Sequence, residues 1–230
     1  MVERKTIVGF LHYRTDLGDG VRTGVYFSSC HGICQNVCMP HAFPREHSFF
    51  GDTEERHTYS ASELVEYLVE EKVRYNAKPI GISFLGKEPL SDPFFCREVA
   101  LGIKESEMNL HIHTCGTCPD FAFDMLFGIA DLFVFQLFSP MPNLFFPFES
   151  YSYQNVLEKL YDLDRKNFPY RLKIPVIETV NTGAAGAFAG LIHTLKNVKS
   201  VILDFNNSGF TLEEQTRYRD VFRDRDIILY

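Results

Sequence analysis

The sequence of 230 residues contains no tryptophan, no long apolar run and no block of basic residues. A helix that crosses a membrane needs about 20 predominantly apolar residues, so we do not expect a membrane-spanning segment. Lys and Arg total 23 against 30 Asp and Glu, which gives a net charge of −7. Binding to a phosphate backbone depends on clustered cations. General nucleic-acid binding is therefore not expected, although a small nucleobase substrate is compatible with this charge.

The beginning of the chain lacks the features of a secretory signal. MVERKTIVGF leads from charged residues into an apolar strand, without an apolar h-region or a small-residue cleavage site. We therefore expect a cytoplasmic protein. In a reducing compartment, the clustered thiols of a chain with six cysteines more often bind metal or carry out redox chemistry than form disulfides. We also find no low-complexity segment and no linker, and we expect a single domain over residues 1–230.

Apolar segments alternate with amphipathic segments along most of the chain. The apolar runs predict strands at 22–30, 79–84, 109–116, 131–138, 170–180 and 199–206, with a short final strand near 227–230. Helical periodicity and capping residues predict helices at 60–77, 92–107, 119–130, 152–167, 182–197 and 211–224. This alternation is typical of an α/β fold, either a doubly wound sheet or a (β/α) barrel, whose chemistry lies at the carboxyl ends of the strands.

The region from 39 to 59 breaks this alternation. It is polar and has no clear period, although it contains several phenylalanines. We interpret it as a long loop insertion over the site, in which Phe43, Phe49 and Phe50 would close over the mouth.

The segment SSCHGICQNVCMP, residues 28–40, places Cys30, Cys34 and Cys38 four residues apart. Thiolates bind zinc and iron–sulfur clusters. A structural zinc site usually has four protein ligands, and His31 or His41 would supply the fourth. A [4Fe–4S] cluster held by three cysteines leaves one iron open to a small molecule. Buried structural thiols are a third interpretation, but the glycine, asparagine and proline of this segment disfavour the helix that would align them.

Five segments occur in order, and each includes or follows an expected strand. They are GDGVRTGVYFSSC (18–30), SFLGKEPLSD (83–92), HTCG (113–116), DLFVFQLF (131–138) and RLKIPVIETVNTG (171–183). They resemble, in turn, the stretches DGPGIRxxxFxxGC, FSGGEPLLQ, DTNG or ETSG, DLVLLDIK and WIRxVVVPGVND of radical S-adenosylmethionine (SAM) enzymes. The resemblance is to the glycyl-radical-enzyme activases, the pyruvate formate-lyase activating enzyme family, and it extends from about residue 7 to 206.

The resemblance implies a single radical-SAM-like domain, a partial (β/α)6 TIM-like barrel of parallel strands with outer helices. It implies that Cys30, Cys34 and Cys38 hold a [4Fe–4S] cluster whose open iron binds SAM. An electron from the cluster would split SAM into methionine and a 5′-deoxyadenosyl radical, which takes a hydrogen atom from the substrate. In activases the substrate is a glycine of a partner glycyl radical enzyme, and the electron comes from a donor such as flavodoxin or ferredoxin.

The resemblance also implies a set of residues that bind SAM. The GKEP turn corresponds to the GGEP motif, whose backbone carbonyls lie against the methionyl amino group. The basic position on the fifth strand faces the SAM carboxylate. The residues so implied are Gly86, Lys87, Glu88, Pro89, Thr114, Gly116, Gln136, Lys173 and Pro175.

Several positions depart from the activase pattern. The cysteine loop is CX3CX3C instead of CX3CX2C, and Val37 occupies an aromatic position. Lys87 replaces a glycine, His113 and Gln136 replace carboxylates, and Phe138 replaces a lysine. Two further functions therefore stay open. One is a small-molecule radical SAM enzyme of the deazaguanine-synthase type. The other is an iron–sulfur protein that has lost SAM cleavage and acts as an electron carrier or binding module.

Two more cysteines, Cys115 and Cys118, follow the expected strand at 109–116 with CxxC spacing. This spacing suits a second metal or a redox pair, and the alternative is two buried thiols at a strand end. In the same strand we expect His111 and His113 to face opposite sides of the sheet.

Overall fold

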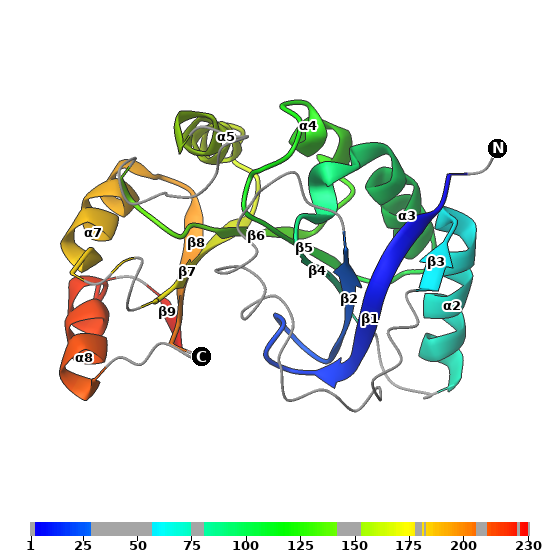
Figure 1. The fold of residues 1–230 in the computed structure, drawn as a ribbon, viewed down its shortest axis with the longest axis horizontal. Coiled ribbons are helices and arrows are strands. Elements are labelled where there is room, and N and C mark those ends of the chain that lie inside the picture. The colour runs from blue at the N-terminus through cyan, green and yellow to red at the C-terminus, as the bar shows by residue number, and fades with distance from the viewer. Residues whose placement is uncertain are drawn as a thin grey trace.

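The computed structural model of the chain describes residues 3–28, 57–74, 81–141, 153–177, 181, 183–205, 211–224 and 226–229 (Figure 1). The strands are β1 Lys5–Arg14, β2 Arg22–Phe27, β3 His57–Tyr59, β4 Gly81–Gly86, β5 Leu110–Thr114, β6 Leu132–Gln136, β7 Tyr170–Pro175, β8 Val198–Asp204 and β9 Ile227–Leu229. The helices are α2 Ala61–Arg74, α3 Pro93–Glu105, α4 Ala122–Leu126, α5 Tyr153–Arg165, α7 Ala185–Thr194 and α8 Leu212–Val221, with a short 3-10 helix, η2, at Pro89–Ser91.

All nine of these strands form one sheet, in the order β3-β1-β2-β4-β5-β6-β7-β8-β9. β2, β4, β5, β6, β7 and β8 are parallel, each to the next, and β9 extends this series. β1 is antiparallel to both β2 and β3. The six parallel strands β2 and β4 to β8 are those expected from the apolar runs, and the predicted α/β fold of a partial barrel is confirmed.

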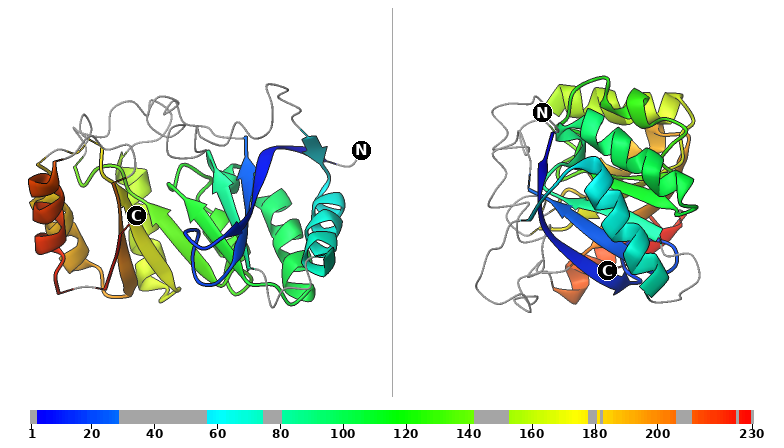
Figure 2. Two further views of the ribbon diagram at one scale, coloured as in Figure 1. Left: turned by 90° about the horizontal axis from the view of Figure 1, so that it is seen from below. Right: turned by 90° about the vertical axis from the view of Figure 1, so that its right-hand side faces the viewer.

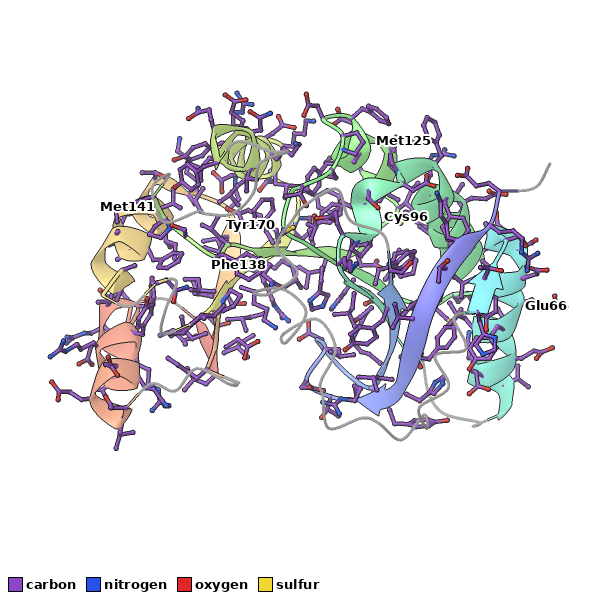
Figure 3. All side chains as sticks on the ribbon, in the orientation of Figure 1. Glu66, Cys96, Met125, Phe138, Met141 and Tyr170 are labelled. Atoms are coloured by element: carbon purple, nitrogen blue, oxygen red, sulfur yellow. The ribbon has the colours of Figure 1, made fainter. Side chains whose placement is uncertain are left out.

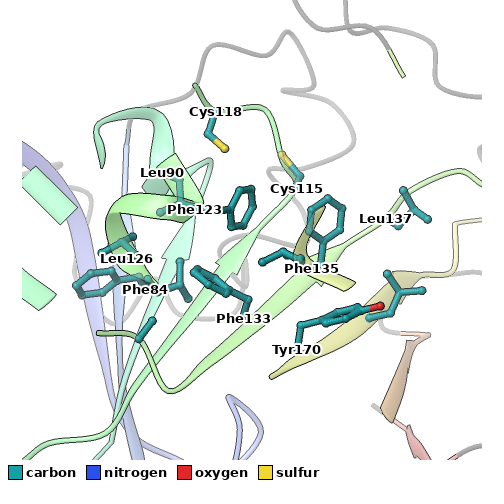
Figure 4. Close-up of a cluster of buried hydrophobic side chains, with 14 of the residues drawn as sticks. Phe84, Leu90, Cys115, Cys118, Phe123, Leu126, Phe133, Phe135, Leu137 and Tyr170 are labelled. Carbon is teal, nitrogen blue, oxygen red and sulfur yellow. The ribbon is translucent and has the colours of Figure 1, made fainter. Parts of the chain in front are cut away.

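The sheet is curved, and the helices follow one another round its outer side (Figures 1 and 2). Alternate strand residues face the helices and form the main core, which Figure 4 shows around Phe84, Phe133 and Phe135. Phe138 and Tyr170 lie in this interior, whereas Glu66 projects from the outside of α2 (Figure 3). The intervening residues face the concave side, where some of them, with Leu17 from the connection between β1 and β2, form two small apolar clusters. These are Leu11, Leu17, Tyr26 and Leu85, and Leu132, Val134 and Ile202.

The helix starts follow the capping signals in the sequence. Ser60 caps α2, because its hydroxyl accepts a hydrogen bond from the Glu63 backbone N–H while the Glu63 carboxylate accepts one from the Ser60 N–H. Pro93 stands in the first turn of α3 after Asp92, which caps it.

Two expectations about elements were wrong. Residues 57–59, expected to be loop, form β3, because the exposed edge of β1 offers them backbone hydrogen-bonding partners. The remainder of the expected insertion, including Phe43, Phe49 and Phe50, lies outside the described residues. The helix expected at 119–130 covers only Ala122–Leu126, and Gly128, at φ +73°, lies in the turn that follows. None of the helices in the described part of the chain has the length and apolar character needed to cross a membrane.

Candidate functional site

The carboxyl ends of β2, β4, β5, β6 and β7 lie along one edge of the sheet. Gly86 pairs with Phe27 at the end of β2, Gln136 pairs with Lys173, and Pro175 pairs with Asp204. The segments that the resemblance singled out are therefore neighbours in space. Cys30, Cys34 and Cys38, with His31 and His41, lie outside the described residues, so their role as ligands stays a prediction.

The turn after β4 requires a glycine at its first position. Gly86 has φ +104°, and a Cβ atom there would lie 2.4 Å from the Phe27 carbonyl oxygen. The Lys87 N–H donates a hydrogen bond to that same carbonyl, at 3.2 Å. The backbone of this turn is thereby held against the end of β2, the strand that leads into the cysteine segment.

Glu88 is fully buried, and its carboxylate reaches from the turn after β4 to the end of β5. Its carboxylate accepts hydrogen bonds from the Leu90 N–H (3.1 Å), the Thr114 hydroxyl (3.0 Å) and the Cys115 N–H (3.0 Å). Burial raises the pKa of Glu88, and these hydrogen bonds act in the opposite direction. Glu88 therefore connects two turns of the site through its side chain, while Pro89 begins η2.

The turn after β5 depends on Thr114 and Gly116. The Thr114 hydroxyl accepts a hydrogen bond from the Gly116 N–H at 3.0 Å. Gly116 has φ +76°, and a Cβ atom there would lie 2.9 Å from the Phe135 ring. The threonine and the glycine of HTCG thus shape this turn.

The thiols of Cys115 and Cys118 lie in the core beside Phe123 and Phe135 (Figure 4). Burial raises the pKa of Cys118 well above its ordinary value. The Cys115 thiol donates to the Glu88 carboxylate at 3.3 Å and lies 3.0 Å from the Thr117 hydroxyl. Among the described residues, no group of three or more His, Cys, Asp and Glu side chains is arranged to hold a metal ion. These surroundings are those of core thiols.

Lys173 on β7 faces the concave side and is already engaged. Its Nζ lies 2.7 Å from an Oδ of Asp204, and both side chains are largely buried. Gln136 is the β6 neighbour of Lys173, and Pro175 is the β7 neighbour of Asp204. Asp204 was missed in the sequence, where its only signal is its position at the end of the apolar run VILD.

The expectation that His111 and His113 face opposite sides was wrong. Residues two apart in a strand share a face, and both imidazoles lie on the concave side, near the charges of β7. Burial, and then the Arg22 charge, lowers the pKa of His111 to about 3. Burial, and then Lys173, lowers the pKa of His113 well below its ordinary value. Both rings are therefore neutral at physiological pH.

Several solved structures share this fold. A domain of pyruvate-formate lyase-activating enzyme from Bacteroides vulgatus is 19% identical over 65% of this chain and 98% of its own, with a TM-score of 0.59. Streptococcus suis SuiB bound to S-adenosylmethionine is 14% identical over 74% of this chain and 41% of its own, with a TM-score of 0.54. The structure of anSMEcpe with bound AdoMet is 10% identical over 77% of this chain and 57% of its own, with a TM-score of 0.58.

The chain thus has the fold of the radical SAM enzymes, which confirms at the level of fold the resemblance drawn from its sequence. It spans about half the length of SuiB and anSMEcpe and nearly all of the activating-enzyme domain. No protein-family profile and no curated protein matches the sequence.

Proposed function

We propose that this chain is a radical SAM enzyme, in which Cys30, Cys34 and Cys38 bind a [4Fe–4S] cluster and the neighbouring strand ends bind SAM. The observation that carries the proposal is the convergence of the GKEP and HTCG turns, Gln136 and Lys173 on one edge of a radical SAM fold. In parallel α/β sheets this edge is where ligands bind.

The described residues fit a ligand of this kind. The Gly86 turn brings backbone, without a side chain, to the end of β2, and its carbonyls are suited to accept hydrogen bonds from an ammonium group. Beneath this turn lies the carboxylate of Glu88, which accepts its hydrogen bonds from the neutral donors of Leu90, Thr114 and Cys115. A buried carboxylate held by neutral donors favours a positively charged ligand group nearby.

When bound, the cluster and SAM would together supply a 5′-deoxyadenosyl radical for hydrogen-atom abstraction. The chain's own residues would bind and orient SAM. The turn at 86–87 would fix the amino end of SAM. Gln136 on β6 and Pro175 on β7 would contact other parts of SAM. The neutral His113 lies on the same concave face. The curved sheet would keep the reacting atoms away from bulk water.

We further propose that the hydrogen atom comes from a glycine of a partner glycyl radical enzyme, with flavodoxin or ferredoxin as the electron donor. The similarity in fold to a domain of pyruvate-formate lyase-activating enzyme supports this choice. A small-molecule substrate, as in enzymes of the deazaguanine-synthase type, is the alternative within the same chemistry. A reaction with a synthetic glycine-containing peptide compared with a panel of small molecules would separate the two.

Two observations favour a different function, an iron–sulfur protein without SAM cleavage. Lys173 is paired with Asp204 at 2.7 Å, so its ammonium would have to exchange partners to meet a SAM carboxylate. Lys87 belongs to the turn that would receive the SAM ammonium. The positive charges of Lys87 and of the SAM ammonium would repel each other. Such a protein would act as an electron carrier or binding module.

Anaerobic reconstitution tests the cluster. We expect four irons per chain in the wild type, a marked loss of iron after Cys30→Ala, and no loss after Cys96→Ala, which removes a buried thiol that bonds to the Pro89 carbonyl in the core. Addition of SAM should change the EPR spectrum of the reduced cluster. Zinc as the only metal that copurifies or can be loaded anaerobically would contradict the proposal.

A further inference from the structure

Strands β4 and β5 separate before either one ends. Their last backbone pair is Phe84 with Ile112, although β4 continues to Gly86 and β5 to Thr114. On its other side, β4 stays paired with β2 as far as Gly86, and the Lys87 N–H extends that pairing by one hydrogen bond. Among the described residues, the 86–87 turn is therefore held by backbone hydrogen bonds on the β2 side alone.

The carboxylate of Glu88 spans the gap on the β5 side. One oxygen accepts from the Leu90 N–H, and the other accepts from the Thr114 hydroxyl, the Cys115 N–H and the Cys115 thiol. All four partners are donors, which is the set that an ionised carboxylate satisfies and an amide does not. The Thr114 hydroxyl accepts in turn from the Gly116 N–H, so a continuous chain of hydrogen bonds joins the turn after β5 to Glu88.

We propose that Glu88 is a positioning residue, whose buried side chain sets the GKEP turn and the HTCG turn at a fixed separation and thereby orients the backbone carbonyls at 86–87 toward a cationic ligand group. This inference rests on the proposed function, because the ligand group in question is the SAM ammonium. Glu88 itself is fully buried and acts through the two turns, without contact to the ligand.

The resemblance implies that the GKEP motif contacts its ligand through backbone atoms. The hydrogen bonds of the Glu88 carboxylate give a reason for an acidic side chain at this position. Glutamine has the same shape but replaces one acceptor oxygen by an amide donor, which would face either the Leu90 N–H or the donors from β5. Thr114→Val would remove the hydroxyl from the middle of this series of hydrogen bonds, whereas Thr114→Ser would keep the hydroxyl. The two substitutions at Thr114 therefore separate the hydrogen bond from the size of the side chain.

Hydrogen exchange in the protein without SAM tests the positioning directly. In Glu88→Gln and Thr114→Val we expect the amides of Lys87, Cys115 and Gly116 to exchange about tenfold faster or more, since an unsatisfied buried donor loosens its segment. Thr114→Ser should exchange as the wild type does. Glu71→Gln is the matched control, because Glu71 is also a buried glutamate but lies on α2, away from this edge.

SAM binding to the cluster-loaded protein tests the consequence. We expect Glu88→Gln to raise the Kd for SAM about tenfold or more while four irons per chain are retained, and Glu71→Gln to bind SAM as the wild type does. Unchanged exchange in Glu88→Gln, or an equal loss of SAM affinity in Glu71→Gln, would overturn the inference. A wild-type protein that loads iron but binds no SAM would overturn the proposed function, and the exchange experiment would still decide whether Glu88 holds the two turns.

Discussion

At the scale of single residues, Arg22 is a buried charge on the concave face with several hydrogen-bonding partners. Its guanidinium donates to the Ser83 hydroxyl (2.7 Å), to the Ile82 carbonyl (2.5 Å) and to both the side-chain and backbone oxygens of Asn109 (2.9 and 3.2 Å). Burial lowers the pKa of Arg22 to about 10, and the side chain stays charged at neutral pH. It joins the beginning of β2 to β4 and to the residue before β5.

Arg22→Lys tests this junction. Lysine keeps the charge but cannot reproduce the planar set of donors, so several buried oxygens lose their partner. We expect a loss of roughly 2–4 kcal/mol in the free energy of unfolding, measured by urea denaturation. The control is Arg165→Lys, an exposed arginine at the end of α5, which should change stability by less than about 0.5 kcal/mol. Equal effects of the two substitutions would contradict this role.

His111 predicts how stability depends on pH. Its pKa in the folded protein is about 3, below the ordinary value near 6.5, so the unfolded chain binds more protons between these two values. Stability should therefore fall as pH drops below about 6.5, at up to about 1.4 kcal/mol per pH unit for this histidine. Urea unfolding from pH 7 to 4 should show a shallower fall in His111→Gln than in the wild type. His193→Gln, at an exposed position, should keep the wild-type slope. Identical slopes in the wild type and both variants would show that His111 is not the source of the pH dependence.

At the scale of elements, α8 offers a local test. Thr211 and Glu214 form a capping box, in which each side chain accepts a hydrogen bond from the backbone N–H of the other. Thr211→Ala should cost about 1 kcal/mol. Thr216→Ala, on the exposed surface of the same helix, should be neutral or slightly stabilising, because alanine is the better helix former. A thermal melt of both variants decides this, and equal destabilisation would argue against the cap.

The elements that the sequence predicted well are those whose signal is local. The apolar runs at 131–138 and 199–206 contain the largely buried strands β6 and β8, and Ser60 and Thr211 cap helices through hydrogen bonds to residues three positions away. β3 was missed because a strand of three residues with exposed side chains owes its existence to the edge of β1. The error over His111 and His113 was one of strand geometry, since residues two apart share a face.

At the scale of the whole molecule, the parallel topology explains why the location of the site could be predicted. Parallel strands bring their carboxyl ends to one edge, so the GKEP and HTCG segments had to meet once the strands were assigned. The contacts across that edge could not be predicted. Lys173 meets Asp204 through the register of β7 and β8, which shifts between Tyr170 and Leu172. Glu88 reaches Thr114 because β4 and β5 separate early. Neither the shift nor the separation has a signal in the sequence.

The central proposal is that this chain performs radical SAM chemistry. The most direct test is the release of 5′-deoxyadenosine by the anaerobically reconstituted, reduced protein in the presence of SAM, quantified against its cluster content. We predict at least one 5′-deoxyadenosine per cluster, and none from Cys34→Ala. Protein that carries a full complement of four irons per chain, yet forms no 5′-deoxyadenosine with SAM and reductant, would contradict the claim and leave an iron–sulfur protein that has lost SAM cleavage.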